Sequence, residues 1–456
     1  MERPRESALL TDLYELTMAA AYFENDLRPQ ATFELFVRKL PANRGYLLAA
    51  GLEQALDYLE TLRFSDEQVA FLRRHPVFAN VGDGFFSYLK SLRFTGEVWA
   101  VPEGTPVFSE EPLLRVRGPI IEAQIVETFL ISTLTFQTLV ATKAARVVEA
   151  AEGRSVVEFG TRRAHGPEAG VLAARAAFLG GCIGTSNVEA GRRFGIPTYG
   201  TVAHSFVMAY EDEAESFRQF QQVFPEHAIL LVDTYDTLAA IDKIVQAGMR
   251  PQGVRLDSGD LVELSKAVRR RLDAGGLKET KIFASGDLNE YAIRDALARG
   301  AQLDFFGVGT ELATSKDAPA LGGVYKLVEV IPDAEPRYRA KLSEDKVTYP
   351  GRKQVFRFRD PQGFYDHDVI AREEESYPEG EALLGCVLRE GRRTAPSPPL
   401  KEIQERAREN LRRLPERYKQ FENPDDYPVR PSRALEELLE EVRQKMLEAD
   451  AKKNPE

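Results

Sequence analysis

The sequence has little of what disulfide-bonded, metal-binding or membrane proteins need. It contains 2 cysteines, Cys182 and Cys386, among 456 residues, too few for a disulfide framework or a structural zinc site. No run approaches the roughly 20 uninterrupted apolar residues of a membrane helix. The first six residues, Met-Glu-Arg-Pro-Arg-Glu, lack the apolar core of a signal peptide. These absences predict a protein of the reducing cytoplasm that has no membrane partner.

A basic excess is also missing. Lys and Arg total 60 against 71 Asp and Glu, which gives a formal net charge of −11. Nucleic-acid-binding proteins usually carry a basic face, so we expect no nucleic-acid partner. Hydrophobic residues make up 43% of the chain, an ordinary globular proportion. The length indicates two or three domains.

Residues 1–118 have the pattern of a mixed α+β domain. Pro119 suits the first turn of a long helix that runs to about residue 151, in two pieces. Before it, apolar spacing and turn residues predict helices at 8–24, 49–61, 66–74 and 83–91, and strands at 31–38, 94–101, 105–109 and 113–117.

From residue 155 onward, short apolar runs alternate with helical segments. Such alternation predicts parallel βα units, and eight runs indicate a barrel, which the short helices make irregular. The fold class is therefore α/β, an irregular parallel (β/α) barrel with a discontinuous α+β N-terminal domain and a helical C-terminal tail. The eight predicted barrel strands are 156–159, 182–185, 198–202, 229–232, 253–256, 281–284, 304–308 and 325–328.

After the barrel the chain turns to charged strands and then to helix. We expect the strands to return to the first domain, and Ser432 to cap the last helix. The predicted organisation is an α+β domain at 1–118, a barrel at 119–328, returning strands at 329–400 and a helical segment at 401–456.

Polar residues follow seven of the predicted barrel strands, and a barrel gathers these ends at one face, where active sites form. His204 is suited to act as a base or as a nucleophile toward phosphorus, with Asp233 or Asp236 accepting from its ring. The glycine-containing loops at 285–287 and 307–310 suit a phosphate group.

Other residues of this face suit anions or flat ligands. Arg162, Arg163 and Arg255 can bind a carboxylate or phosphate, or else pair with nearby acids. Phe159 is either a core residue or a platform for an aromatic ligand. Of Asp257 and Asp260, one is expected to cap a helix, and acidic residues here can also hold Mg²⁺ or ribose hydroxyls.

Together these motifs closely resemble the nicotinate phosphoribosyltransferase family. The resemblance covers most of the chain and is weakest after about residue 400. It rests on the ordered segments 11–18, 158–163, 184–187, 200–205, 255–260, 285–287, 307–310 and 350–354.

The resemblance implies a type II phosphoribosyltransferase fold and the conversion of nicotinate and 5-phosphoribosyl 1-diphosphate to nicotinate mononucleotide and diphosphate. ATP hydrolysis would be coupled to this reaction in the salvage route to NAD. Mg²⁺ would be bound mainly through the diphosphate, with no site made by protein ligands alone. The enzyme would be a homodimer with shared active sites.

The resemblance also assigns roles to residues. His204 would be the histidine that ATP phosphorylates, and Tyr14, from the neighbouring subunit, would stack on the pyridine ring opposite Phe159. Thr201 and Arg255 would contact nicotinate. Apart from the resemblance, the position of Asp257 suits it to stabilise positive charge on the ribose or on the pyridinium. The expected catalytic residues are His204, Asp257 and Asp233, and the expected substrate-binding residues are Tyr14, Phe159, Arg162, Thr201, Ser205, Arg255, Ser258, Ser285, Gly286, Asp287, Gly309 and Thr310.

Three other functions compete with this interpretation. A nicotinamide phosphoribosyltransferase would carry Asp at the position of Ser186, where a carboxylate would repel nicotinate. A sugar-phosphate aldolase or isomerase would need a base or a lysine at a strand end, and the polar ends contain no lysine. A ligand-binding relative without activity would not need both His204 and Arg255.

Overall fold

The computed structural model describes residues 7–332, 335–343 and 346–453 and divides into two compact units. Unit 1 comprises Met1–Thr138 and Ala320–Glu456, and unit 2 comprises Leu139–Pro319. Helix α6 (Glu127–Ala150) continues through the boundary between them. Residues 1–6, on which the expectation about a signal peptide rests, lie outside the described part.

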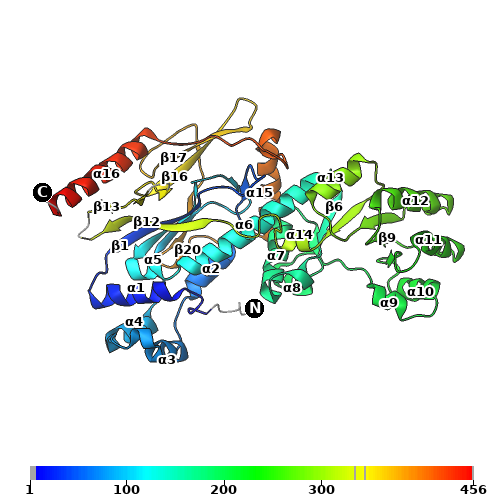
Figure 1. Cartoon of the computed structure of the whole chain (residues 1–456), viewed down its shortest axis with the longest axis horizontal. Helices are drawn as coiled ribbons and strands as arrows, with labels where there is room; N and C mark the ends of the chain where they lie inside the picture. Colours follow the sequence, from blue (N-terminus) through cyan, green and yellow to red (C-terminus); the bar gives the residue numbers. More distant parts are fainter. Residues whose placement is uncertain (1–6, 333–334, 344–345, 454–456) are drawn as a thin grey trace. The chain divides into compact units, whose positions relative to one another are not determined.

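Unit 1 contains a seven-stranded sheet that both parts of the unit build. Its strand order is β13-β12-β1-β5-β3-β19-β20. Strand β1 pairs antiparallel with β5 on one side and with β12 on the other, and β1 and β12 are labelled in Figure 1. The discontinuous α+β domain is therefore confirmed. The strands are β1 (Gln30–Val37), β3 (Glu97–Ala100), β5 (Pro112–Pro119), β12 (Gly323–Ile331), β13 (Arg337–Tyr338), β19 (Gly385–Arg389) and β20 (Arg392–Arg393).

The helices of unit 1 follow the apolar periodicity of the sequence. Ser65 and Gln68 form a capping box at the start of α3, which explains why this helix begins there. The long predicted helix is in two pieces, and Pro119 stands directly before the first of them. The helices are α1 (Leu13–Glu24), α2 (Leu52–Thr61), α3 (Asp66–Arg74), α4 (Asp83–Ser91) and α5 (Ile120–Gln124).

The C-terminal part of unit 1 adds a four-stranded sheet and two helices. The sheet has the order β18-β16-β17-β21, and helix α16 lies beside β17 (Figure 1). The Ser432 hydroxyl accepts from the backbone N–H of Leu435 at 3.1 Å, as expected of a cap. The elements are β16 (Lys353–Arg359), β17 (Tyr365–Arg372), β18 (Glu381–Ala382), β21 (Val429–Pro431), α15 (Leu400–Arg413) and α16 (Arg433–Lys453).

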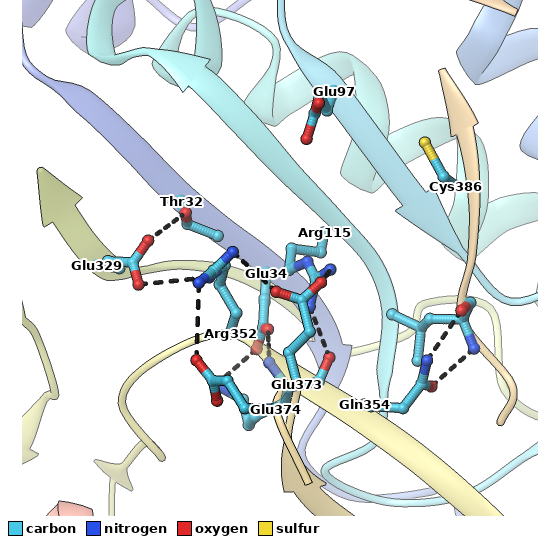
Figure 2. A network of polar contacts seen from close by, with 12 residues as sticks. Thr32, Glu34, Glu97, Arg115, Glu329, Arg352, Gln354, Glu373, Glu374 and Cys386 are labelled. Carbon is cyan, nitrogen blue, oxygen red and sulfur yellow. Dashed lines mark hydrogen bonds and ion pairs between the residues drawn. The ribbon is translucent and has the colours of Figure 1, made fainter. Parts of the chain in front are cut away.

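A network of charged side chains joins β16 to the β1–β5 pair. Figure 2 shows Glu34 and Arg115 at its centre, with Arg352 and Glu373 beside them. Lys353 Nζ lies 2.6 Å from Glu34 Oε2, and Arg115 donates to the Lys353 carbonyl oxygen at 2.9 Å and pairs with Glu373. Burial lowers the pKa of Lys353, and Glu34 opposes that shift. The 350–354 motif thus has a structural use within unit 1.

Unit 2 is built on a six-stranded parallel sheet of order β7-β6-β11-β10-β9-β8. Helices follow the strands, so the parallel α/β fold class is confirmed (Figure 1). The strands are β6 (Ser155–Glu158), β7 (Gly184–Thr185), β8 (Ile229–Leu231), β9 (Gly253–Leu256), β10 (Lys281–Ala284) and β11 (Phe305–Val308). The main helices are α7 (Pro167–Leu179), α8 (Val188–Phe194), α10 (Glu213–Val223), α11 (Thr237–Gln246), α12 (Leu261–Ala274) and α13 (Glu290–Ala298).

Two of the eight predicted barrel strands are wrong. Residues 325–328 belong to β12, which pairs antiparallel with β1 in unit 1. Residues 198–202 form no strand, and Thr198 makes a single bridge to Thr185. A short apolar run looks alike in either kind of sheet, and only its hydrogen-bonding partners distinguish the two.

The segment Ile120–Ala150 is long and apolar enough to cross a membrane by length and composition alone. However, 67% of its most apolar window is buried inside the protein. Polar side chains within it, among them Gln137, Lys143 and Arg146, are also buried. These features are those of a helix in the core of a folded unit.

Candidate active site

A cavity of about 610 Å³ lies within unit 2, lined by residues that follow the parallel strands. Such ends meet at one edge of a parallel sheet, where ligands bind in α/β proteins. Its lining residues include Phe159, Arg162, Arg163, Ser186, Thr201, His204, Arg255, Asp257, Ser285, Gly286, Asp287, Gly309 and Thr310.

Arg255, near the end of β9, is held by three neighbours. Its Nε donates to the Ser285 hydroxyl at 2.7 Å, its Nη1 to the Thr201 hydroxyl at 2.7 Å, and its Nη2 to Asp257 Oδ1 at 2.5 Å. The plane of the guanidinium is therefore fixed. The guanidinium has five N–H donors, and these three hydrogen bonds leave two of them. One of the two is on Nη1, which lies 3.5 Å from the carbonyl oxygen of Val202.

His204 is the first residue of the short helix α9 (His204–Met208), and its side chain is 42% exposed. Its Nδ1 lies 3.1 Å from the Thr234 hydroxyl, and its Nε2 lies 3.9 Å from Asp257 Oδ2. The first distance is that of a hydrogen bond and the second is longer than one. The ring is thus oriented by Thr234, with Nε2 on the side of Asp257.

The sequence predicts Asp233 or Asp236 as the ring partner of His204, and the structure corrects this prediction. Asp233 Oδ2 accepts from the backbone N–H of Asp257 at 2.9 Å and from the Ser258 hydroxyl at 2.6 Å. Asp236 caps α11, where it accepts from the backbone N–H of Ala239 at 2.7 Å. Both carboxylates stabilise backbone segments, which leaves the neighbouring Thr234 to contact the ring.

Asp257 is one of two carboxylates that line the cavity, the other being Asp287. Burial raises its pKa, but the hydrogen bond from Ser285 and the charge of Arg255 outweigh this, so the pKa lies below its ordinary value. Asp257 therefore carries a negative charge at neutral pH, with Oδ2 on the side of His204. Asp260, in contrast, caps α12 through the backbone N–H groups of Val262 and Glu263.

Phe159 both packs in the core and lines the cavity. Its ring stacks on Phe283 with 5.6 Å between centroids, and the Arg255 guanidinium carbon lies 5.9 Å from its centroid. A Cβ added to Gly307 would lie 2.6 Å from the Phe159 ring, so only glycine lets the ring lie this close to β11. Before it, Glu158 is buried and accepts from the Thr185 hydroxyl at 2.6 Å.

The two glycine-containing loops also lie at the cavity. Gly286 has φ of 113°, a conformation that disfavours other residues, and an added Cβ would lie 2.9 Å from the Asp257 carbonyl oxygen. Gly309 and Thr310 stand at the start of α14 (Thr310–Ala313). Close backbone approach of this kind leaves N–H groups accessible to an anion.

The structure brings most, but not all, of the expected residues together. Ser205, Ser258 and Asp233 are not among the residues that line the cavity. Tyr14 belongs to unit 1, where it is 45% exposed. Burial, with Glu127 nearby, raises its pKa. Thr234 was missed, although it stands inside a polar segment that follows a predicted strand.

The described part of the chain holds no group of three or more His, Cys, Asp or Glu side chains arranged to bind a metal ion.

Family models match three segments that together cover most of the chain. The N-terminal domain of nicotinate phosphoribosyltransferase matches residues 9–135, and the C-terminal domain of that enzyme matches residues 379–439. The C-terminal domain of quinolinate phosphoribosyl transferase matches residues 140–318. A parallel α/β unit of this kind, inserted in an α+β unit, places the chain among the phosphoribosyltransferases.

Individual relatives narrow this class. A nicotinate phosphoribosyltransferase of Mycobacterium tuberculosis is 46% identical over 94% of this chain and 92% of its own, and one of Bacillus subtilis is 40% identical over 92% of each. The human nicotinic acid phosphoribosyltransferase structure has a TM-score of 0.83 at 30% identity and covers 94% of this chain and 99% of its own. The nicotinate-nucleotide pyrophosphorylase structure from Pyrococcus furiosus has a TM-score of 0.72 at 25% identity, over 91% and 99%. The chain belongs to the nicotinate phosphoribosyltransferase family.

Proposed function

We propose that this enzyme of NAD salvage joins nicotinate to 5-phosphoribosyl 1-diphosphate in the cavity of unit 2, and that phosphorylation of His204 by ATP is coupled to the transfer. One observation carries the proposal. His204, Arg255 and Thr310 line the same cavity, although they lie far apart along the chain. A nucleophile toward phosphorus, a fixed cation and a glycine-containing loop are the groups that this coupled reaction needs.

Arg255 and Phe159 are the proposed nicotinate contacts. With its plane fixed by Ser285, Thr201 and Asp257, the guanidinium offers a carboxylate one N–H on Nη2. A second N–H, on Nη1, has only the long contact of 3.5 Å with the Val202 carbonyl oxygen. Phe159 offers the face of a ring next to that cation. We further propose that Tyr14 of the neighbouring subunit in a homodimer provides the second aromatic face.

Ser186 supports nicotinate rather than nicotinamide as the substrate. It lies on the wall of the cavity and is uncharged, so it does not repel the nicotinate carboxylate. A competition between the two substrates at equal concentration tests this choice, because a preference for nicotinamide would contradict it.

The chemistry needs charge stabilisation more than proton transfer. The pyridine nitrogen is a neutral nucleophile, and its attack on the anomeric carbon passes through an oxocarbenium-like state. The charged Asp257 suits the positive charge that develops on the ribose. Gly286, Gly309 and Thr310 are the proposed contacts of the 5-phosphate, with Ser285 and Asp287 beside them.

A bound Mg²⁺ would be held mainly by the oxygens of the diphosphate and would supply charge neutralisation for that leaving group. Arg162 lies exposed on the cavity wall and is a further anion contact. Ser205 and Ser258, which lie outside the lining, stay predictions as substrate contacts. We place the reaction in the cytoplasm, because the two cysteines, Cys182 and Cys386, are both free thiols, which suits a reducing compartment.

Product formation with and without ATP tests the proposal. His204→Ala should abolish phosphoenzyme formation and the stimulation by ATP, and should leave a slow transfer from nicotinate, 5-phosphoribosyl 1-diphosphate and Mg²⁺. His227→Ala, which removes an exposed imidazole elsewhere in unit 2, is the matched control. Full stimulation by ATP in the His204→Ala variant would refute the assignment.

A further inference from the structure

We propose that Thr234 is a positioning residue that makes Nε2 of His204 the atom that receives the phosphoryl group. The inference rests on the proposed function of His204 and goes beyond it, because it names the reacting atom and the side chain that prepares it. Thr234 stands three residues after the end of β8, between two carboxylates that are engaged elsewhere.

The two ring nitrogens of His204 have different neighbours. Nδ1 lies 3.1 Å from the Thr234 hydroxyl, whereas Nε2 lies 3.9 Å from Asp257 Oδ2, which is beyond hydrogen-bond distance. Asp257 lines the cavity and Thr234 is not among the lining residues. Nε2 is therefore the nitrogen on the side of the cavity residues, and Nδ1 is already occupied.

A neutral imidazole carries one proton, and only its other nitrogen has a free lone pair. Attack from Nε2 requires the proton on Nδ1, and the Thr234 hydroxyl is placed to accept a hydrogen bond from Nδ1–H. Without that acceptor, nothing at Nδ1 opposes the tautomer with the proton on Nε2. The Asp257 charge, 3.9 Å from Nε2, favours that unreactive tautomer.

The phosphoryl transfer balances with this proton placement. The Nε2 lone pair forms the N–P bond as the bond from the γ-phosphorus to the bridging oxygen breaks, and ADP leaves with that electron pair. The ring becomes a phosphorylated imidazolium that still donates Nδ1–H to Thr234. Water later attacks phosphorus, Nε2 takes back its electron pair, and inorganic phosphate leaves.

A hydroxyl at this position differs in kind from a carboxylate. It accepts from Nδ1–H while the ring attacks, and after rotation it donates to Nδ1 when the phosphorylated ring loses that proton. The same side chain therefore hydrogen-bonds the ring before and after phosphorylation. Serine keeps this ability, whereas valine keeps the shape of threonine and loses it.

The experiment compares Thr234→Val, Thr234→Ser and the control Thr237→Val, which makes the same change at the first residue of α11. The rate of phosphoenzyme formation is measured with ATP labelled in its γ-phosphate. Transfer from nicotinate and 5-phosphoribosyl 1-diphosphate without ATP is measured in parallel, with the melting temperature as a check of folding. ³¹P NMR of the phosphoenzyme distinguishes the two phosphorylated nitrogens.

Loss of the hydroxyl should slow phosphorylation about fivefold in Thr234→Val, the effect of one hydrogen bond, and should slow ATP-independent transfer less. Thr234→Ser and Thr237→Val should phosphorylate at nearly the wild-type rate, and the phosphoryl group should be on Nε2. A wild-type rate in Thr234→Val, a Thr234→Ser variant as slow as the valine variant, equal losses in both assays, or phosphate on Nδ1 would overturn the inference.

Measurements on the wild-type enzyme distinguish a wrong role for Thr234 from a wrong proposed function. If it forms no phosphohistidine and His204→Ala loses no ATP stimulation, the coupling itself is refuted, and the role of Thr234 with it. If wild-type His204 is phosphorylated and Thr234→Val behaves like wild type, only the role of Thr234 is refuted.

Discussion

Replacement of Arg255 by lysine keeps the positive charge of the cavity and removes the planar fork. The guanidinium donates to three oxygens at once, on Ser285, Thr201 and Asp257, at 2.7, 2.7 and 2.5 Å. A lysine ammonium is a compact charge on a flexible stem. It can keep the ion pair with Asp257, but it cannot hold all three oxygens in one plane.

The expected loss of kcat/KM follows from the two hydrogen bonds, to Ser285 and Thr201, that lysine cannot keep. Each hydrogen bond to a neutral hydroxyl contributes about 1 kcal/mol, so the positioning of the cation weakens by about 2 kcal/mol. Since about 1.4 kcal/mol corresponds to a factor of ten, kcat/KM for nicotinate should fall about 30-fold. The effect should fall on nicotinate because Arg255 is its proposed carboxylate contact.

Steady-state kinetics with nicotinate varied, at saturating ATP and 5-phosphoribosyl 1-diphosphate, measure this loss. A second series with ATP varied gives the comparison, and Arg250→Lys, an exposed arginine before β9, is the matched control. If KM for ATP rises by the same factor as KM for nicotinate, Arg255 does not select the pyridine substrate. A change in kcat/KM for nicotinate below about threefold, less than one hydrogen bond, would refute the argument from geometry.

Three further changes test other parts of the structure. Gly286→Ala should cost about 1–3 kcal/mol of strain and raise KM for 5-phosphoribosyl 1-diphosphate, whereas Gly276→Ala, also at positive φ but with no atom near the added Cβ, should leave that KM unchanged. The pKa of Asp257 is lowered in the folded protein, so the charged carboxylate stabilises the fold relative to the Asp257→Asn variant. This difference in the free energy of unfolding should be complete above the unfolded pKa of about 3.9 and should be lost as the pH falls below it. Urea unfolding of both proteins at a series of pH values through that pKa measures the difference, and a difference that grows on acidification would contradict the prediction. Lys353→Met should lower the free energy of unfolding by about 3–5 kcal/mol, since it leaves the buried Glu34 charge unpaired, and a double variant with Glu34→Leu should regain most of this. A single variant as stable as the double one would show that the pair is not coupled.

Much of the fold could be predicted because helices and strands follow from local patterns. The periodicity of apolar residues placed the helices of unit 1 close to their observed bounds, and Pro119 marked the start of α5. The assignment of 325–328 to the barrel failed because the partner of that strand, β1, lies near the other end of the chain. Pairing between distant segments leaves no local trace in either segment.

The sequence by itself determined the chemical groups of the site. Arg255, Asp257 and the two glycine-containing loops could be named because each directly follows, or ends, a recognisable strand. His204 was named from the predicted strand 198–202, which the structure does not contain. Only the tertiary structure decided how these groups are paired. It shows that Thr234 and neither Asp233 nor Asp236 contacts the His204 ring, and that Asp257 joins Arg255 and Ser285. The physical reason is that hydrogen bonds act over about 3 Å, so partners are set by the positions of neighbouring strands and loops in space, which residue order along one strand does not specify.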